Sequence, residues 1–425
     1  MKKRDQILTD IRLNSIISNI QYPISNIQTS LRTYIQSVYF LLFPNKTKLS
    51  KSSLISPFFC FLSILFIHLF LAACADLGTD SSITKKYTVN FQTDGGSAVP
   101  SVVLTGGTTL DTTLSQTITA PTKAASGTTT YYFGDWYTVD KATGHTGKTK
   151  YDYTKPVTGN ITLYARWYNK QPADKAALQA LITTDSGDFN HIDVRKITNM
   201  SQLFSDKLNF NGNISGWDVS GVTDMNHMFS PRDEADRQKF NQPIGDWDVS
   251  NVTDMNAMFA NADKFNQPIG DWNVSNVTNM SQMFDIAQEF NQSIENWDVS
   301  GVTNMTSMFN IAIKFNHPIE SWNVSSVTNM NSMFNFASKF NQPIGSWDVS
   351  EVTDMSYMFY FASKFNQPIG SWDVSEVTDM SYMFNSASTF NRDISGWTVT
   401  QVTTHLQIFG GSSSMSGDNK PPTFR

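Results

Sequence analysis

The chain has 425 residues, with 31 Lys and Arg against 37 Asp and Glu, and only 16% of its residues are charged. This length suffices for two or three domains, while the low charged fraction excludes a charge-rich disordered chain and a coiled coil. A net charge of -6 argues against nucleic acid as a partner, and a total of two Cys excludes a disulfide scaffold. Of the protein classes considered, a β-rich, exported or repetitive protein fits this composition.

The N-terminal segment 1–73 has the pattern of an export signal with a long n-region. Lysines within 46–51 precede an apolar run from Phe58 to Leu71, which is the order of a secretory signal. The run ends in Leu71-Ala72-Ala73-Cys74, which resembles the bacterial lipobox. This resemblance implies that Cys74 is lipidated and that the protein is held at the membrane through a lipid anchor. The alternative is a transmembrane anchor in which Cys74 has no role.

Residues 74–86 follow as a lipidated polar tether, and 87–168 predict a small β module. Alternating runs such as Ile161–Trp167 predict short strands, and Gly95-Gly96 predicts a turn. A V-x-F start at Val89, a central Trp136-Tyr137 and a closing L-Y-A-x-W at Leu163 resemble the internalin-type B-repeat of bacterial surface proteins. The resemblance implies a β-grasp-like spacer or modest binding module without catalysis. Asp135 stands where that family usually has Gly, so a different local turn is expected.

A repeat fills residues 189–409. Eight Trp residues mark it, spaced by 30 residues once and then by 25 residues six times: Trp217, Trp247, Trp272, Trp297, Trp322, Trp347, Trp372 and Trp397. Ile192 opens the same pattern one step earlier, so nine rungs are readable. Each rung contains an I-x-x-W-x-V-x-x-V segment, followed by apolar residues at i, i+3, i+4 and i+7, as at Met280, Met283, Phe284 and Ala287. The first pattern predicts a short strand and the second a short helix.

The full motif, F-N-x-x-I-x-x-W-D-V-S-x-V-T-x-M-x-x-M-F, closely resembles the BspA-type leucine-rich-repeat surface proteins of bacteria. The resemblance implies an α/β leucine-rich-repeat solenoid, display on the cell surface and binding of varied ligands. Within the linker 170–188, Ala173–Leu181 predicts an amphipathic helix that caps the first rung. Residues 410–425 are expected to form a disordered tail.

Three polar or sulfur-containing ladders accompany the repeat. The Met ladder is interpreted as core rather than as a metal or redox site, because its helical spacing beside Phe favours burial. An Asn ladder is expected to satisfy loop backbone groups from rung to rung. A second ladder is interpreted as helix capping: Asp224, Asp254, Asn279, Asn304, Asn329, Asp354 and Asp379.

Enzymatic chemistry finds little support in the sequence. The six His residues share no repeat position, and no nucleophile, zinc or phosphate-loop motif occurs. The sequence therefore predicts no catalytic residue, no metal site and no cofactor.

The outward position between Trp and Val is the candidate binding site. Asp193 opens this column, and the candidate ligand-binding residues continue it: Asp218, Asp248, Asn273, Asp298, Asn323, Asp348 and Asp373. Stacked like charges are destabilising, so an acidic strip for a basic protein surface, a sugar or bridging Ca²⁺ is one explanation. The other is that each side chain bonds a nearby Ser or backbone group and serves only the fold.

The sequence thus predicts a lipid-anchored protein of the bacterial surface that binds an extracellular protein or glycan through its solenoid. A self-associating structural component of the cell envelope is the alternative. A hydrolase hidden in the repeats is a further rival. It would need a rung with clustered catalytic groups, and the irregular stretch 230–238 is interpreted as a solvated loop.

Overall fold

The computed structural model describes residues 85–110, 119–139, 148–233, 235–411 and 414–424. The predicted export signal, Cys74 and nearly all of the tether lie outside the described residues. Within the described ranges, no helix combines the length and the apolar character needed to cross a membrane.

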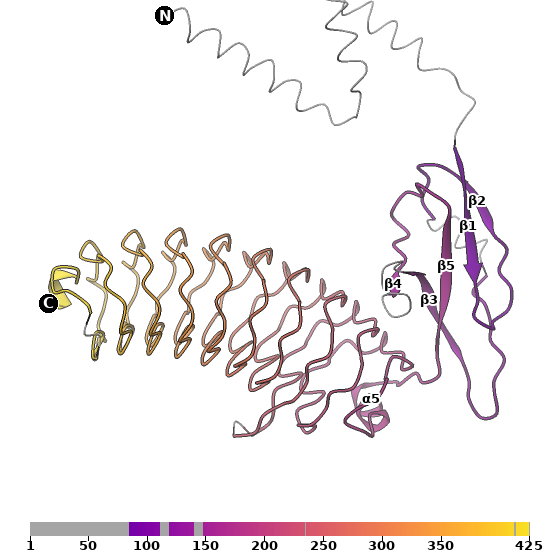
Figure 1. Ribbon diagram of the computed structural model, residues 1–425, viewed down its shortest axis with the longest axis horizontal. Coiled ribbons are helices and arrows are strands. Elements are labelled where there is room, and N and C mark those ends of the chain that lie inside the picture. Colours follow the sequence, from indigo (N-terminus) through magenta and orange to yellow (C-terminus); the bar gives the residue numbers. More distant parts are fainter. Residues whose placement is uncertain (1–84, 111–118, 140–147, 234, 412–413, 425) are drawn as a thin grey trace, which may run out of the picture. The chain divides into compact units, whose positions relative to one another are not determined.

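The N-terminal module is a five-stranded mixed sheet (Figure 1). Its strands are β1 (Lys86–Gln92), β2 (Val102–Thr105), β3 (Tyr132–Val139), β4 (Lys148–Lys150) and β5 (Ile161–Tyr168), in the spatial order β2-β1-β5-β3-β4. The central pair, β1 and β5, is parallel, with Phe91 opposite Leu163, and the other pairs are antiparallel. The strand order and the parallel pairing of β1 with β5 agree with the β-grasp-like sheet that was expected. The described residues of this module, which leave out 111–118 and 140–147, contain no helix.

Apolar side chains that alternate with polar ones along the strands pack together in a small core. Val89, Trp136 and Leu163 are buried, and Phe91 and Phe133 contact Trp136 edge to face at 4.8 and 5.4 Å between ring centroids. The pairing of β3 with β5 shifts register between Phe133 and Trp136. At this bulge the Asp135 carboxylate accepts hydrogen bonds from its neighbour's backbone N–H and from a Tyr hydroxyl.

The repeats are not the predicted α/β leucine-rich-repeat solenoid. Between 182 and 411 the described residues contain neither a helix nor a strand. The helix α5 (Lys175–Leu181) lies within the segment predicted to cap the first rung, and its Leu178 joins the core of the repeats. The rungs after it are series of turns, joined to one another by isolated parallel bridges such as Asn279 with Asn304 (Figure 1).

The segment from Met280 to Ala287, predicted to be helical, forms two consecutive turns. The backbone N–H of Met283 donates to the carbonyl of Met280 at 3.2 Å, and that of Ala287 donates to Phe284 at 3.0 Å. The third residue of each turn, Gln282 or Ile286, has a positive φ of 57° or 58°. Two such turns bury the same i, i+3, i+4 and i+7 residues that a helix would bury.

Every second N–H group of this segment, from Met280 to Ile286, bonds to the next rung. The N–H of Gln282 donates to the carbonyl of Thr306 at 2.7 Å, and that of Phe284 donates to Met308 at 3.0 Å. A helix would instead direct them to carbonyls four residues back within the rung. Because there is no helix to cap, the helix-capping interpretation of the Asp224 to Asp379 ladder is wrong. The backbones of that ladder form the parallel bridges, and its side chains accept from the N–H two residues later, as at Asn304.

The inward residues form one continuous core. The Met ladder is fully buried, which confirms that it belongs to the core: Met255, Met258, Met280, Met283, Met305, Met308, Met330, Met333, Met355, Met358, Met380 and Met383. Phe rings stack from rung to rung, as Phe284 does on Phe309 at 5.7 Å. From Trp247 onward, each Trp indole N–H of the repeats donates to an Ile carbonyl of the preceding rung, for example Trp297 to Ile269 at 3.0 Å.

The Asn ladder also behaves as the sequence predicts. The side-chain oxygen of Asn291 accepts the backbone N–H of Asn316 at 3.0 Å, and that of Asn316 accepts the N–H of Asn341 at 2.9 Å. The C-terminal tail differs from the disorder expected of it. In its described part, 414–424, Met415 is buried, Phe424 packs on the core of the repeats, and the carbonyl of Asn419 accepts the N–H of Ile394 at 2.9 Å.

Candidate functional site

The column residues project from turns held by a buried residue on each side. In each rung the Trp and Val that flank the column residue are buried, which leaves the residue between them facing outward. Its Oδ1 atom accepts the backbone N–H of the Ser two residues later, and in most rungs also the Ser hydroxyl. At Asp248 these bonds from Ser250 are 3.1 and 2.6 Å. The turn therefore fixes the direction of the carboxylate.

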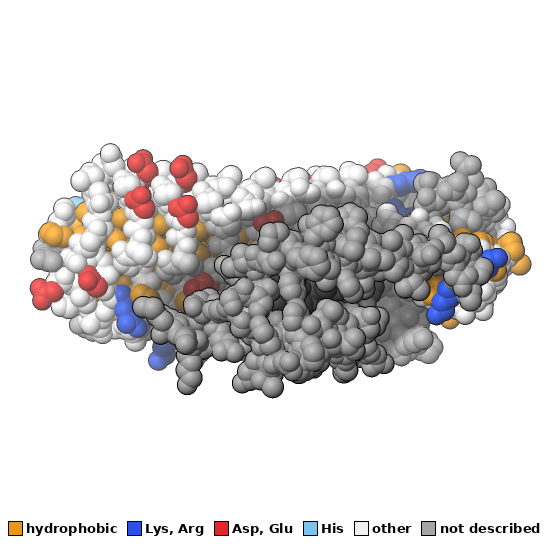
Figure 2. All heavy atoms as spheres, turned by 90° about the horizontal axis from the view of Figure 1, so that it is seen from above, with side chains coloured by type: hydrophobic (Ala, Val, Ile, Leu, Met, Phe, Trp, Pro, Cys, Tyr) orange, Lys and Arg blue, Asp and Glu red, His pale blue; other side chains and the backbone are white. Residues whose placement is uncertain are grey.

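These local bonds favour the ionised form of two exposed carboxylates, Asp298 and Asp373. Donation from the Ser300 hydroxyl and backbone lowers the pKa of Asp298, and Ser375 lowers the pKa of Asp373 in the same way. The hydrogen bonds to both residues engage Oδ1, so negative charge is presented outward. On the face shown in Figure 2, acidic side chains gather toward the C-terminal end of the repeats, apart from the Lys and Arg side chains.

The first members of the column are not available to a ligand. The Asp218 side chain is only 8% exposed and lies 3.2 Å from the Lys150 ammonium, which also contacts Asp135. Burial opposes its ionisation, but the Ser220 hydroxyl and Lys150 outweigh burial and lower the pKa of Asp218. Asp193 is buried as well and pairs with Arg195 at 2.8 Å. The exposed part of the column, called the acidic column below, consists of Asp248, Asn273, Asp298, Asn323, Asp348 and Asp373.

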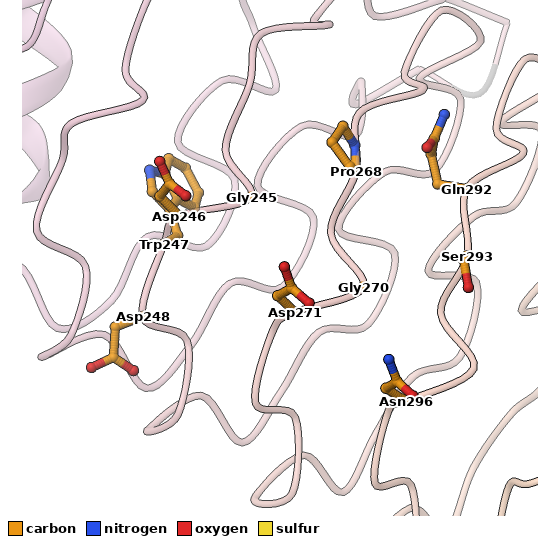
Figure 3. Close-up of a pocket in the computed structure, with 10 residues that line it drawn as sticks. All are labelled: Gly245, Asp246, Trp247, Asp248, Pro268, Gly270, Asp271, Gln292, Ser293 and Asn296. Carbon is orange, nitrogen blue, oxygen red and sulfur yellow. The ribbon is translucent and has the colours of Figure 1, made fainter. Parts of the chain in front are cut away.

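A depression of about 560 Å³ lies beside the start of the acidic column (Figure 3). It crosses neighbouring rungs and is lined by Gly245, Asp246, Trp247, Asp248, Pro268, Gly270, Asp271, Gln292, Ser293 and Asn296. Sequence reasoning did not single out Asp246 and Asp271. The repeat pattern could have indicated them, because both precede a Trp and so occupy one repeat position that is polar in the next four rungs.

The depression offers polar contacts rather than a cation cage. In Figure 3 the carboxylates of Asp246, Asp248 and Asp271 stand apart from one another. Over the described ranges, no three His, Cys, Asp or Glu side chains come together as a metal ion would require. Bridging of the acidic column by Ca²⁺ therefore has no geometric support in this part of the chain. The arrangement suits hydrogen bonding and ion pairing with a ligand that spans several rungs.

Comparison with protein-family models gives three overlapping matches of the repeats to one family, described as Mycoplasma protein of unknown function, DUF285. The matches cover 175–293, 267–360 and 339–421, which together exceed half of the chain. The chain belongs to this DUF285 family. Its description assigns no function, and the resemblance to BspA-type leucine-rich-repeat proteins is not confirmed.

The sheet module matches a second family model, the Listeria-Bacteroides repeat domain, over 87–166. These are nearly the residues in which the sequence resembles an internalin-type B-repeat. With the DUF285 match, this supports a bacterial surface repeat protein. No curated protein and no solved structure matches the chain.

Proposed function

We propose that this surface repeat protein is an adhesin that binds extracellular protein or glycan ligands non-covalently through its acidic column, and that lipid on Cys74 anchors it. The observation that supports the site is the identical presentation of exposed carboxylates and amides in successive rungs. A ligand with repeated basic or hydroxyl groups would meet several equivalent contacts at once, and weak contacts made together give strong attachment. The proposal assigns the chain no enzyme activity and no cofactor.

The test is binding of the intact protein to arrays of extracellular proteins and glycans. Saturable binding is expected, and we expect it to weaken about tenfold or more when four charges are removed together. The variant is Asp248→Asn, Asp298→Asn, Asp348→Asn and Asp373→Asn. Asparagine already stands at Asn273 and Asn323 of the same column, so the variant is expected to fold.

A matched control removes four carboxylates elsewhere on the repeats: Asp206→Asn, Asp233→Asn, Asp236→Asn and Asp263→Asn. It should bind as the unchanged protein does. Equal binding by the acidic-column variant would refute the site. An absence of any hit, together with concentration-dependent assembly in sedimentation, would favour a self-associating envelope component.

Lipid attachment is tested separately on cells. Metabolic labelling with a fatty-acid analogue should mark the unchanged protein, and Cys74→Ser should abolish the label and release the protein from the membrane fraction. Retention of Cys74→Ser in the membrane without label would indicate a transmembrane anchor instead.

A further inference from the structure

Five aromatic side chains gather on the outer side of three successive rungs, away from the Phe rings of the core. Phe336 stacks on Phe361 at 4.7 Å, and Tyr357 stacks on Tyr382 at 4.8 Å between ring centroids. Tyr360 lies edge to face with all four, at 4.6 to 6.1 Å. We call this set the aromatic cluster.

The aromatic cluster is confined to these rungs. At the position of Phe336 and Phe361 the other rungs carry polar or aliphatic residues: Asn261, Ile286, Ile311 and Ser386. At the position of Tyr357 and Tyr382 they carry Gln202, His227, Ala257, Gln282, Ser307, Ser332 and Gln407, of which only His227 has a ring. The backbone is the same in all of them, since every one of these residues has a positive φ. The stack of rungs therefore forms without aromatic residues at these positions.

The aromatic residues are also costly where they stand. Phe336, Tyr357, Phe361 and Tyr382 have φ between 53° and 59°, a region that disfavours bulky L-residues and in which Gly or Asn is cheaper. Phe336 and Phe361 are 38% and 39% exposed, so burial in the core does not offset this strain. The fold has this left-handed backbone in the other rungs as well, but it does not require the aromatic side chains that occupy it here, and bulky residues kept in strained conformations are typical of functional sites.

The geometry of the rings favours one kind of partner. In each two-ring stack one face of each ring is covered by its partner, whereas the ring edges, which carry partial positive charge, are not. Three residues after each Phe comes an exposed lysine, Lys339 or Lys364. Lysines of the same column elsewhere pair with carboxylates, Lys264 with Asp263 and Lys314 with Glu289, whereas no ion pair of Lys339 or Lys364 is found among the described residues.

The Phe side of the cluster is thus apolar and electropositive, while Asp379 faces Tyr357 on the other side. We infer that the aromatic cluster, with Lys339 and Lys364, is a docking site for a partner protein segment in which carboxylates alternate with apolar side chains. Apolar side chains would cover the rings, and the carboxylates would pair with the two lysines.

Two other occupants fit less well. A sugar stacks on an open ring face, and each stacked Phe or Tyr ring has one face covered by its partner, which leaves at most one face per ring for a sugar. A second copy of the chain would bring its own acidic column, whose exposed side chains are Asp, Asn and Ser and supply no apolar contact. The inference goes beyond the proposed function and does not depend on the acidic column.

The probe is a set of short synthetic peptides in which Asp or Glu alternates with Leu or Phe, offered to the intact protein. A matched set with Lys in place of the acids, and a panel of neutral and acidic oligosaccharides, are offered in parallel. Saturable binding of the acidic set alone is expected. Phe336→Asn with Phe361→Asn should weaken it about tenfold or more. These substitutions reproduce Asn261, which has the same backbone conformation, so the variant should fold at least as well.

Lys339→Gln with Lys364→Gln should weaken binding about fivefold and reduce its dependence on salt. The control is Lys264→Gln with Lys314→Gln, lysines of the same column that are already paired, and it should have no effect. The four-residue acidic-column variant should bind these peptides unchanged, which separates this site from the proposed one.

Three outcomes would overturn the inference. The first is equal binding of acidic and basic peptides, and the second is unchanged binding by the Phe variant. In the third, the Phe variant loses only oligosaccharide binding or only self-assembly, which would assign the cluster to a glycan or to a second copy.

Discussion

At the residue scale, the unusual feature is a side chain other than Gly at almost every left-handed position of the repeats. Each rung from Met255 onward has two such residues, four apart, as at Ser332 and Phe336 with φ of 56° and 54°. The N–H of each donates to the next rung, at 2.9 Å from Ser332 and 2.7 Å from Phe336. Bonds on both sides of a rung therefore hold a conformation that the residue types themselves disfavour.

Ser332→Gly should relieve this strain. The left-handed conformation costs a residue with a Cβ about 1–2 kcal/mol, and the extra freedom of Gly in the unfolded chain returns about 0.5–1 kcal/mol of that gain. We expect a net stabilisation of about 0.5–1 kcal/mol and a higher Tm in thermal unfolding. Ser338→Gly, in the same rung but without a positive φ, is the control and should lower the Tm. A lower Tm for Ser332→Gly would contradict the strain.

At the scale of the element, each rung is a loop of turns. The spacing of the residues determines which side chains point inward, and hydrogen bonds to neighbouring rungs hold the polar atoms in place. Asn316 illustrates this, since its side-chain oxygen accepts the Asn341 N–H at 2.9 Å and a Gln342 side-chain N–H at 3.1 Å. One side chain thereby fixes the loop of the next rung.

Asn316→Ala should destabilise the repeats by about 1–2 kcal/mol, because the Asn341 N–H loses its acceptor. Chemical denaturation followed by Trp fluorescence measures this. Asn323→Ala is the comparison, since Asn323 is exposed and its side chain accepts a local bond from the Ser325 N–H. If both substitutions cost the same, the ladder does not link the rungs as described.

The inward positions could be read from the sequence, but the secondary structure could not. The positions of Trp272, Val274, Met280 and Phe284 follow from periodicity alone, and all are buried. The same spacing fits a helix or two consecutive turns, and the residue that decides between them, such as Ile286 with φ 58°, carries none of the Gly or Asn signature that marks left-handed turns.

The candidate site was predictable to a similar degree. Alternation placed Asp298 outward and the Ser two residues later beside it, because both facts are local. The burial of Asp218 was not predictable, since it depends on Lys150, which is 68 residues away in the chain. The aromatic cluster was missed because Phe and Tyr are interpreted as core until the backbone shows them facing outward.

At the scale of the whole molecule, charged groups join the sheet module to the first rungs. Lys150 contacts both Asp135 and Asp218, and Arg195 pairs with Asp193 while donating to the carbonyls of Gly134 and Phe133. Although burial opposes their ionisation, these cationic partners and hydrogen bonds lower the pKa values of Asp193 and Asp218. A carboxylate with a lowered pKa stabilises the fold only while it is ionised.

The stability that Asp218 contributes therefore depends on pH. The contribution of Asp218 is complete above its unfolded pKa of 3.8 and is lost as the pH falls below that value through the folded pKa. We therefore expect Asp218→Asn to cost about 1–2 kcal/mol at neutral pH and little in strong acid. Thermal unfolding of the intact protein across this range measures the difference.

Asp248→Asn, the same position one rung later and exposed, should leave both the neutral Tm and its acid dependence nearly unchanged. Equal effects of the two substitutions would mean that the contact with Lys150 adds nothing to stability.

The uniform donors and acceptors of the rungs also determine how the length of the stack can change. Successive rungs from Met255 onward offer the same N–H groups to one neighbour and the same carbonyls to the other, so loss or gain of the segment between Trp297 and Trp322 would join surfaces that already match. Each such change would lengthen or shorten the stack by about 4.8 Å. The stack can therefore be made longer or shorter in whole rungs while the core stays the same.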